Sequence, residues 1–191
     1  MTITTDMVKE LRARTGAGVM DCRRALEETG GNFDRAAEIL RMKGLAAAAK
    51  RAGRTTSEGV IEAYIHPGSR LGALVELNCE TDFVAHTEEF KKLARELAMQ
   101  VAAASPRYLS KADVPSEALA ERRAELARES DGAGAAEVER LLAQWLDEVS
   151  LLDQPYIRDA GRRVSDVVAD TTARVGEHVQ VRRFARFKLG E

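Results

Sequence analysis

The stretch from residue 71 to residue 79 alternates between apolar and other side chains, and this pattern limits the folds open to the chain. Every second position is apolar, at Leu71, Ala73, Val75, Leu77 and Cys79. This is the period of a β-strand with one apolar face, as found in a sheet that is covered on one side. A second β-rich run, residues 59–65, precedes it across the turn signal Pro67-Gly68. The sequence therefore predicts a β-hairpin.

The first fifty residues have the period of helices instead. Glycines divide them into three segments with apolar residues at helical spacing, and these breaks lie at positions 16, 18, 30, 31 and 44. We expect Asn32 to cap the third helix and Gly44 to end it, and the alanine-rich residues that follow Gly44 read as a helix extension that runs into a linker. The sequence thus predicts a three-helix domain over residues 1–52, a basic and polar linker at 53–58, and a core domain over residues 59–191.

Helices and one more strand are expected after the hairpin. A helix capped by Thr87 should end before Pro106, and further apolar stripes predict helices from Ser116, over 138–149 and over 164–175. The segment ESDGAGAAE interrupts the pattern between the first two of these, and HVQVRRFARFKL reads as a closing strand. The predicted fold class is α+β, with a three-stranded antiparallel sheet packed against helices.

Composition and charge exclude several classes of function. A membrane-spanning helix needs about 18 to 20 apolar residues, and no apolar run approaches this length. The N-terminus lacks the features of a secretory signal. We therefore expect a cytoplasmic protein without a membrane partner. A formal net charge of −2 argues against a nucleic-acid partner. The basic strand VRRFARFK could stack on bases, but a half-buried strand edge explains it as well.

Catalytic and metal-binding patterns are not evident in the sequence. His66, His86 and His178 show no spacing typical of a catalytic group, and no glycine-rich phosphate-binding loop is present. Cys22 and Cys79 lack metal-ligand spacing and are interpreted as small buried hydrophobic residues. We therefore expect no enzyme, no metal, no cofactor and no direct nucleotide binding.

Two loops carry apolar residues that need an explanation. RTGAGVMDC places Val19 and Met20 beside two glycines, and ETDFVAH places Phe83 and Val84 before a helix. Each pair could be a hydrophobic staple or a core contact that fixes the direction of the chain. Each could also be an exposed anchor that fills a pocket on another protein. Local pattern alone leaves both interpretations open.

Two longer segments resemble a known family. VKELRARTGAGVMDCRRALEETGGNFDRA is similar to the N-terminal, ubiquitin-associated-like domain of bacterial elongation factor Ts (EF-Ts), and ELNCETDFVA resembles the second signature of that family. QPYI and the terminal RFARFKLGE match it too, so the resemblance covers essentially the whole chain. It implies a guanine-nucleotide exchange factor that promotes GDP release and GTP loading on the translational GTPase EF-Tu during translation elongation, without covalent chemistry.

The resemblance also implies which residues contact EF-Tu. Asp82 and Phe83 would approach the GTPase domain, where the phenylalanine would act as a wedge that disturbs the groups holding the magnesium ion and phosphates. The full set implied by the two motifs is Thr81, Asp82, Phe83, Val84, Arg12, Val19, Met20 and Arg23. At two of these positions, Val19 and Arg23 replace residues that are often methionine and lysine in relatives, and apolar character and charge survive the changes.

The chain resembles the short form of the family, whose members are implied to work as dimers. An exposed strand edge over residues 179–187 offers a route to a homodimer, because it could pair with its copy.

Two other functions remain open at this stage. One is a ubiquitin-associated-like interaction module, acting as a chaperone or scaffold without exchange activity, and the other is an enzyme, against which the lack of a placed nucleophile or acid-base pair counts.

Overall fold

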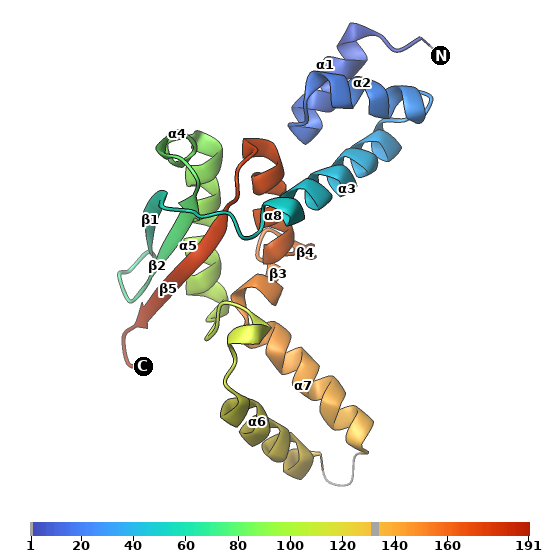
Figure 1. Cartoon of the computed structure of the whole chain (residues 1–191). Coiled ribbons are helices and arrows are strands. Elements are labelled where there is room, and N and C mark those ends of the chain that lie inside the picture. Colours follow the sequence, from blue (N-terminus) through green and yellow to red (C-terminus); the bar gives the residue numbers. More distant parts are fainter. Residues whose placement is uncertain (1, 131–133) are drawn as a thin grey trace. The chain divides into compact units, whose positions relative to one another are not determined.

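The computed structural model of the chain describes residues 2–130 and 134–191 (Figure 1). The helices are α1 Thr5–Thr15, α2 Val19–Glu28, α3 Phe33–Arg51, α4 Asp82–Ala85, α5 Glu88–Ala104, α6 Ser116–Glu129, α7 Ala135–Val149 and α8 Val164–Val175. The strands are β1 Glu58–Ile65, β2 Leu71–Cys79, β3 Pro155–Tyr156, β4 Asp159–Arg163 and β5 Gln180–Lys188. The predicted α+β class is confirmed.

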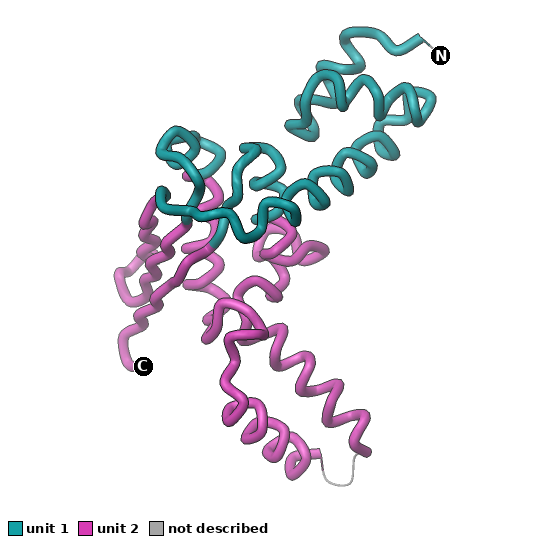
Figure 2. The backbone as a smooth tube through the Cα atoms, viewed as in Figure 1, with its two compact units in different colours: residues 1–59, 78–90, 168–180 teal, residues 60–77, 91–167, 181–191 magenta. Residues whose placement is uncertain are grey.

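The chain forms two compact units (Figure 2). Unit 1 contains residues 1–59, 78–90 and 168–180, and unit 2 contains residues 60–77, 91–167 and 181–191. Each unit is described by itself below. Within the described residues, no helix combines the length and apolar character needed to span a membrane.

The three N-terminal helices of unit 1 enclose a small core of their own. Leu11, Cys22, Ala25 and Leu26 are fully buried within it. Asn32 caps α3 as predicted, because its side-chain oxygen accepts a hydrogen bond from the backbone N–H of Arg35 at 3.0 Å. The bundle thus forms around a small core in which leucines pack with the smaller side chains of Cys22 and Ala25.

The prediction that Gly44 ends the third helix is wrong, since α3 continues to Arg51, whereas the helix extension expected over the alanine-rich residues is confirmed. The alanine-rich residues that follow Gly44 have high helix propensity, which offsets the cost of about 1 kcal/mol for one glycine inside a helix. A Cβ at position 44 would lie 3.0 Å from the Cβ of Ala173 in α8. The glycine therefore serves a close approach to α8 and does not mark a helix end.

The main sheet has strand order β1-β2-β5 and is antiparallel, as predicted. The turn of the β1–β2 hairpin is closed by hydrogen bonds from His66 N to Leu71 O and from Ser69 N to His66 O, both 2.9 Å long. The alternating residues of β2 identified above are buried from Ala73 onward. Since β2 is central, both β1 and β5 are edge strands.

The helices of unit 2 follow the predicted stripes. α5 buries Leu93, Leu97 and Val101, and α6 and α7 lie side by side (Figure 1). These two helices share a small core around Leu126, Val138 and Leu142, on which Trp145 packs half-buried. Trp145 is therefore part of the packing between these two helices. Part of the predicted interruption, residues 131–133, lies outside the described residues.

The small hairpin of β3 and β4 was not predicted. β3 and β4 pair in antiparallel fashion with an irregular register between Pro155 and Tyr156. Beneath it, Gln100 of α5 donates from Nε2 to Gln154 Oε1 at 3.0 Å and accepts from the backbone N–H of Ile157 at 2.8 Å. The hairpin is thus anchored by a glutamine from a distant helix, and a local sequence pattern does not reveal such an anchor.

Candidate functional site

The segment after β2, which the sequence analysis treated as a loop, forms a one-turn helix. Thr81 caps this helix, α4, and its Oγ1 accepts a hydrogen bond from Val84 N at 3.4 Å. Phe83 is 79% exposed and Val84 is 4% exposed. The two residues of this pair therefore differ. Val84 is a core contact, and Phe83 is an exposed apolar side chain.

The same segment is tied to the turn between α8 and β5. The carboxylate of Glu177 accepts hydrogen bonds from Thr81 N at 3.0 Å and from Thr81 Oγ1 at 2.6 Å. In the opposite direction, the Glu80 carboxylate accepts from His178 N at 2.6 Å and lies 3.4 Å from Arg54 Nη1. The hydrogen bond from His178 N, assisted by the Arg54 charge, lowers the pKa of Glu80, so this carboxylate stays ionised at neutral pH.

Cys79 lies at the end of β2, directly before this segment. Its Sγ donates a hydrogen bond to Thr81 O at 3.1 Å. Burial raises the pKa of the Cys79 thiol to about 11, and the negative charge of Glu177 acts in the same direction. The thiol is therefore a protonated donor at neutral pH. Cys22 and Cys79 are both buried and free, as the sequence analysis expected.

A second set of predicted residues lies at the start of α2 and on α1. Gly18 is the N-cap of α2, and Val19 and Met20 in its first turn are at least half exposed. Arg12 of α1 is exposed too. Arg23 is exposed and pairs with Glu27 one turn later at 2.9 Å. These four residues are thus all available to a partner.

One exposed apolar residue of the N-terminal helices was missed in the sequence. Met42 of α3 is 56% exposed. The sequence analysis did not single it out, because no motif or unusual loop contains it. Exposed methionine is a frequent element of protein-binding surfaces because the side chain adapts to its partner, so Met42 extends the set of candidate contacts on this domain.

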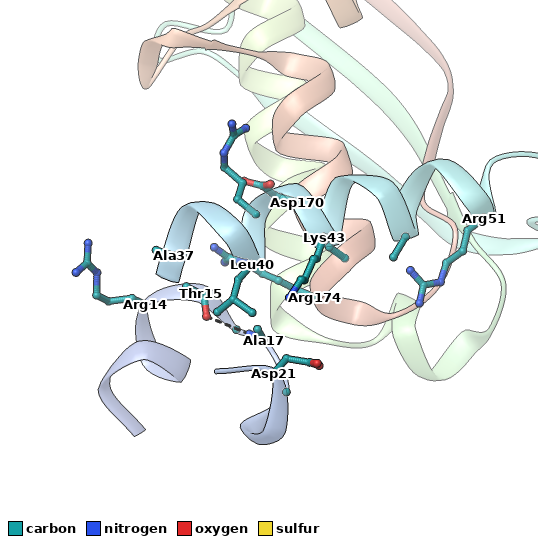
Figure 3. A pocket seen from close by; sticks show the side chains of 16 residues that line it. Arg14, Thr15, Ala17, Asp21, Ala37, Leu40, Lys43, Arg51, Asp170 and Arg174 are labelled. Carbon is teal, nitrogen blue, oxygen red and sulfur yellow. Dashed lines mark hydrogen bonds between the residues drawn. The ribbon is translucent and has the colours of Figure 1, made fainter. Parts of the chain in front are cut away.

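A basic cavity of about 500 Å³ lies within unit 1 beside the loop before α2 (Figure 3). Its charged lining includes Arg14, Lys43, Arg51 and Arg174. Three of these side chains already have acidic neighbours, with Arg14 3.0 Å from Asp34, Lys43 3.7 Å from Glu28 and Arg174 2.8 Å from Glu89. Much of the positive charge around the cavity is therefore balanced by the protein itself.

The three histidines each have a local partner. The Tyr64 hydroxyl lies 3.0 Å from His66 Nδ1, His86 Nδ1 lies 2.7 Å from Asp82 O, and His178 Nδ1 lies 3.0 Å from Arg54 O. Among residues 2–130 and 134–191, no group of three or more histidine, cysteine, aspartate or glutamate side chains could hold a metal ion. The exposed side chains described above are suited to binding a protein surface.

Comparison with known proteins shows what the chain is similar to. A family model described as elongation factor TS matches residues 45–191. The elongation factor Ts of Carboxydothermus hydrogenoformans is 54% identical over 195 aligned positions, which cover 99% of this chain and 90% of that protein. The elongation factor Ts of Caldanaerobacter subterraneus subsp. tengcongensis is 52% identical, with 99% and 98% covered. That of Desulfitobacterium hafniense is 50% identical, with 99% and 90% covered.

Proposed function

Because this chain belongs to the elongation factor Ts family, the nucleotide exchange factors of elongation factor Tu, we propose that Phe83 is the group with which it disturbs the nucleotide site of that partner. The chain is an exchange factor of translation elongation that acts by binding and not as an enzyme. As a bacterial factor of this family it is a cytoplasmic protein. Family membership therefore excludes the two alternative functions considered above, an enzyme and an interaction module without exchange activity.

Exchange requires a coupling between two binding events on the partner. The factor favours a conformation of elongation factor Tu that holds GDP poorly, and by reciprocity bound GDP or GTP weakens the binding of the factor. Each 1.4 kcal/mol of lost nucleotide affinity is about a factor of ten. The factor therefore needs a group that changes the partner's structure on contact, in addition to groups that bind it.

The observation that carries the proposal for Phe83 is its exposure on a fixed turn. An aromatic side chain has few rotatable bonds, so it loses little entropy when a partner buries it. The helix under it is anchored by buried Val84 and capped by Thr81. We assign Phe83 the role of a wedge, Thr81 and Val84 the role of holding the turn, and exposed Asp82 a polar contact beside the ring.

The second proposed contact is the surface formed by Arg12, Val19, Met20 and Arg23. It offers two exposed apolar side chains and two exposed arginines, and methionine and arginine are both enriched at protein-binding surfaces. We assign this surface to affinity for elongation factor Tu and Phe83 to the acceleration of GDP release. The division of the chain at residues 53–58 into domains over 1–52 and 59–191 belongs to the same proposal, since it separates the two contacts along the sequence.

Release of a fluorescent GDP analogue from elongation factor Tu, followed by stopped flow with excess unlabelled GDP, tests the role of Phe83. We expect the wild-type chain to accelerate release and Phe83→Ala to lose most of the acceleration while still binding. Ile157→Ala, which truncates another exposed apolar side chain, is the matched control and should behave as wild type. Undiminished acceleration by Phe83→Ala would remove Phe83 from the proposal.

We also propose that the chain forms a homodimer through its main sheet. Ile61 and Ile65 of β1, Leu74 of β2 and Phe187 of β5 are large apolar residues that are exposed. The Ile65 side chain lies over Gly72, where an added Cβ would be 2.8 Å from Ile65 Cδ1. A second copy of the chain would cover these apolar side chains, whose exposure to water is unfavourable. The edge of β5 could also pair with the same strand of the second copy.

A further inference from the structure

We propose that Glu177 is a positioning residue for nucleotide exchange: by holding Thr81 it fixes the turn that presents Phe83, without itself contacting the partner. Both carboxylate oxygens of Glu177 are used on one residue, with Thr81 N 3.0 Å from Oε2 and Thr81 Oγ1 2.6 Å from Oε1. Hydrogen bonds to an ionised acceptor are shorter and about twice as strong as neutral ones. The inference rests on the role proposed for Phe83.

The geometry at Thr81 explains why one carboxylate can control the whole turn. The Thr81 hydroxyl donates to Glu177 Oε1 and at the same time accepts from Val84 N. A hydroxyl has one proton and two lone pairs, so a donor bond in one direction fixes where its lone pairs point. Glu177 thereby orients the Thr81 oxygen as the N-cap of α4.

Helix α4 depends on this cap because it has only four residues. A single helical turn is unfavourable in water by itself, since the first turn fixes several backbone angles for one hydrogen bond. Its conformation must come from contacts outside the turn. Those contacts are the hydrogen bonds between Glu177 and Thr81 before Phe83 in the chain and the burial of Val84 and Ala85 after it.

Each of the two segments supplies a carboxylate that accepts a hydrogen bond from the other segment. Glu80 next to Thr81 accepts from His178 N at 2.6 Å, and His178 follows Glu177. Two adjacent pairs of residues, 96 to 98 positions apart, thus exchange carboxylate hydrogen bonds. A turn held in this way loses little further entropy when it meets a partner, and such preorganisation is what a wedge needs.

The consequence for function is a separation of rate from affinity. If Glu177 acts only by fixing Phe83, its loss should lower the maximal rate of GDP release at saturating factor and leave the half-saturating concentration nearly unchanged. Small misplacement of a positioned group costs one to two orders of magnitude in rate, so we expect a decrease of about tenfold or more. A merely structural role would lower the thermal midpoint and both kinetic parameters together.

The experiment compares Glu177→Gln with Glu89→Gln, which makes the same change from carboxylate to amide in the exposed Arg174–Glu89 pair of the same unit. Thr81→Val and Thr81→Ser are the second set of variants, since only serine keeps the hydroxyl. We expect Glu177→Gln and Thr81→Val to lower the maximal rate, Thr81→Ser to lose less of the rate than Thr81→Val because serine keeps the hydroxyl, and Glu89→Gln to stay near wild type. Thermal midpoints of all four variants should remain near wild type.

A combination with Phe83→Ala shows through which residue Glu177 acts. In the Phe83→Ala background, Glu177→Gln should cause no further loss of rate, because the group that it positions is already absent. A further loss of the same factor, or a maximal rate of Glu177→Gln equal to that of Glu89→Gln, would overturn the proposal for Glu177. If Phe83→Ala alone retains the wild-type rate, the failure lies in the role proposed for Phe83.

Discussion

Phe83 and Val84 are neighbours in the chain with opposite environments, since Phe83 is 79% exposed and Val84 is 4% exposed. Successive residues of a helical turn point about 100° apart, so a turn of four residues can bury one side chain and present the next. The larger and more apolar of the two side chains is the one left in water. This arrangement opposes the hydrophobic effect for an isolated chain, and the proposed contact of Phe83 with elongation factor Tu would account for it.

The two neighbours should respond differently to truncation. Val84→Ala removes buried methyl groups and leaves a cavity, so we expect the free energy of unfolding to fall by about 2 kcal/mol. Phe83→Ala removes an exposed ring, and the free energy of unfolding should change by less than about 0.5 kcal/mol. Urea denaturation followed by circular dichroism measures both values. Equal losses for the two variants would show that the ring is packed against the protein.

Much of the fold could be predicted because strong periods marked the elements. The alternation of β2 and the apolar stripes of α7 and α8 each predicted the correct element. The hairpin of β3 and β4 escaped prediction, because β4 is largely exposed and charged and its anchor, Gln100, lies on α5. The wrong helix end at Gly44 has a similar origin, since its packing partner Ala173 is more than a hundred residues away.

The candidate site could be predicted in residue type but not in geometry. The TDFV motif drew attention to Phe83, and local sequence allowed both an exposed and a buried ring. The geometry also includes the contact between Thr81 and Glu177, which are 96 positions apart. Nothing around Glu177 in the sequence marks it as a ligand of that loop. Contacts of this length depend on the tertiary fold, and a single sequence does not display them.

The surface at the start of α2 should contribute affinity and not maximal rate. Met20→Ser replaces an exposed apolar side chain without opening a cavity, so the protein should stay folded. We expect the factor concentration that gives half-maximal GDP release to rise about tenfold, equivalent to about 1.4 kcal/mol of binding free energy. Ala49→Ser, at an exposed position of α3, is the control. An unchanged half-saturating concentration would argue against this surface as a contact.

The proposed homodimer should depend on Phe187. A charge placed where an apolar side chain is covered by a second copy is costly to bury, so Phe187→Asp should convert the dimer to a monomer. Light scattering at working concentration measures the mass. Ile157→Asp introduces the same charge at an exposed position outside the main sheet and should leave the dimer intact. A monomeric mass for the wild-type chain would contradict the homodimer itself.

The buried amide of Gln100 should be important for stability. Gln100→Leu keeps a side chain of similar size but leaves the Ile157 N–H and the Gln154 Oε1 without this partner. Each unsatisfied buried group costs about 1–3 kcal/mol, so the free energy of unfolding should fall by about 3 kcal/mol. Gln144→Leu, at an exposed glutamine that bonds Glu148, should have little effect. Urea denaturation distinguishes the two, and equal midpoints would contradict this account.

The Cys79 thiol should make the stability of the protein depend on alkaline pH. Its pKa is about 11 in the folded protein against an ordinary value of 9.0, so the unfolded chain loses this proton at lower pH than the folded one. The stabilisation is therefore complete below about pH 9 and is lost as the pH rises towards 11.

Cys79→Ser keeps a donor for Thr81 O but does not ionise in this range. The fall in the urea midpoint between pH 8 and pH 10.5 should then be larger for wild type than for Cys79→Ser. Because all other ionisable side chains are the same in the two proteins, the difference between the two decreases isolates Cys79. Equal decreases would mean that the folded thiol ionises as readily as the unfolded one, and that burial at the base of the Phe83 turn does not protect it.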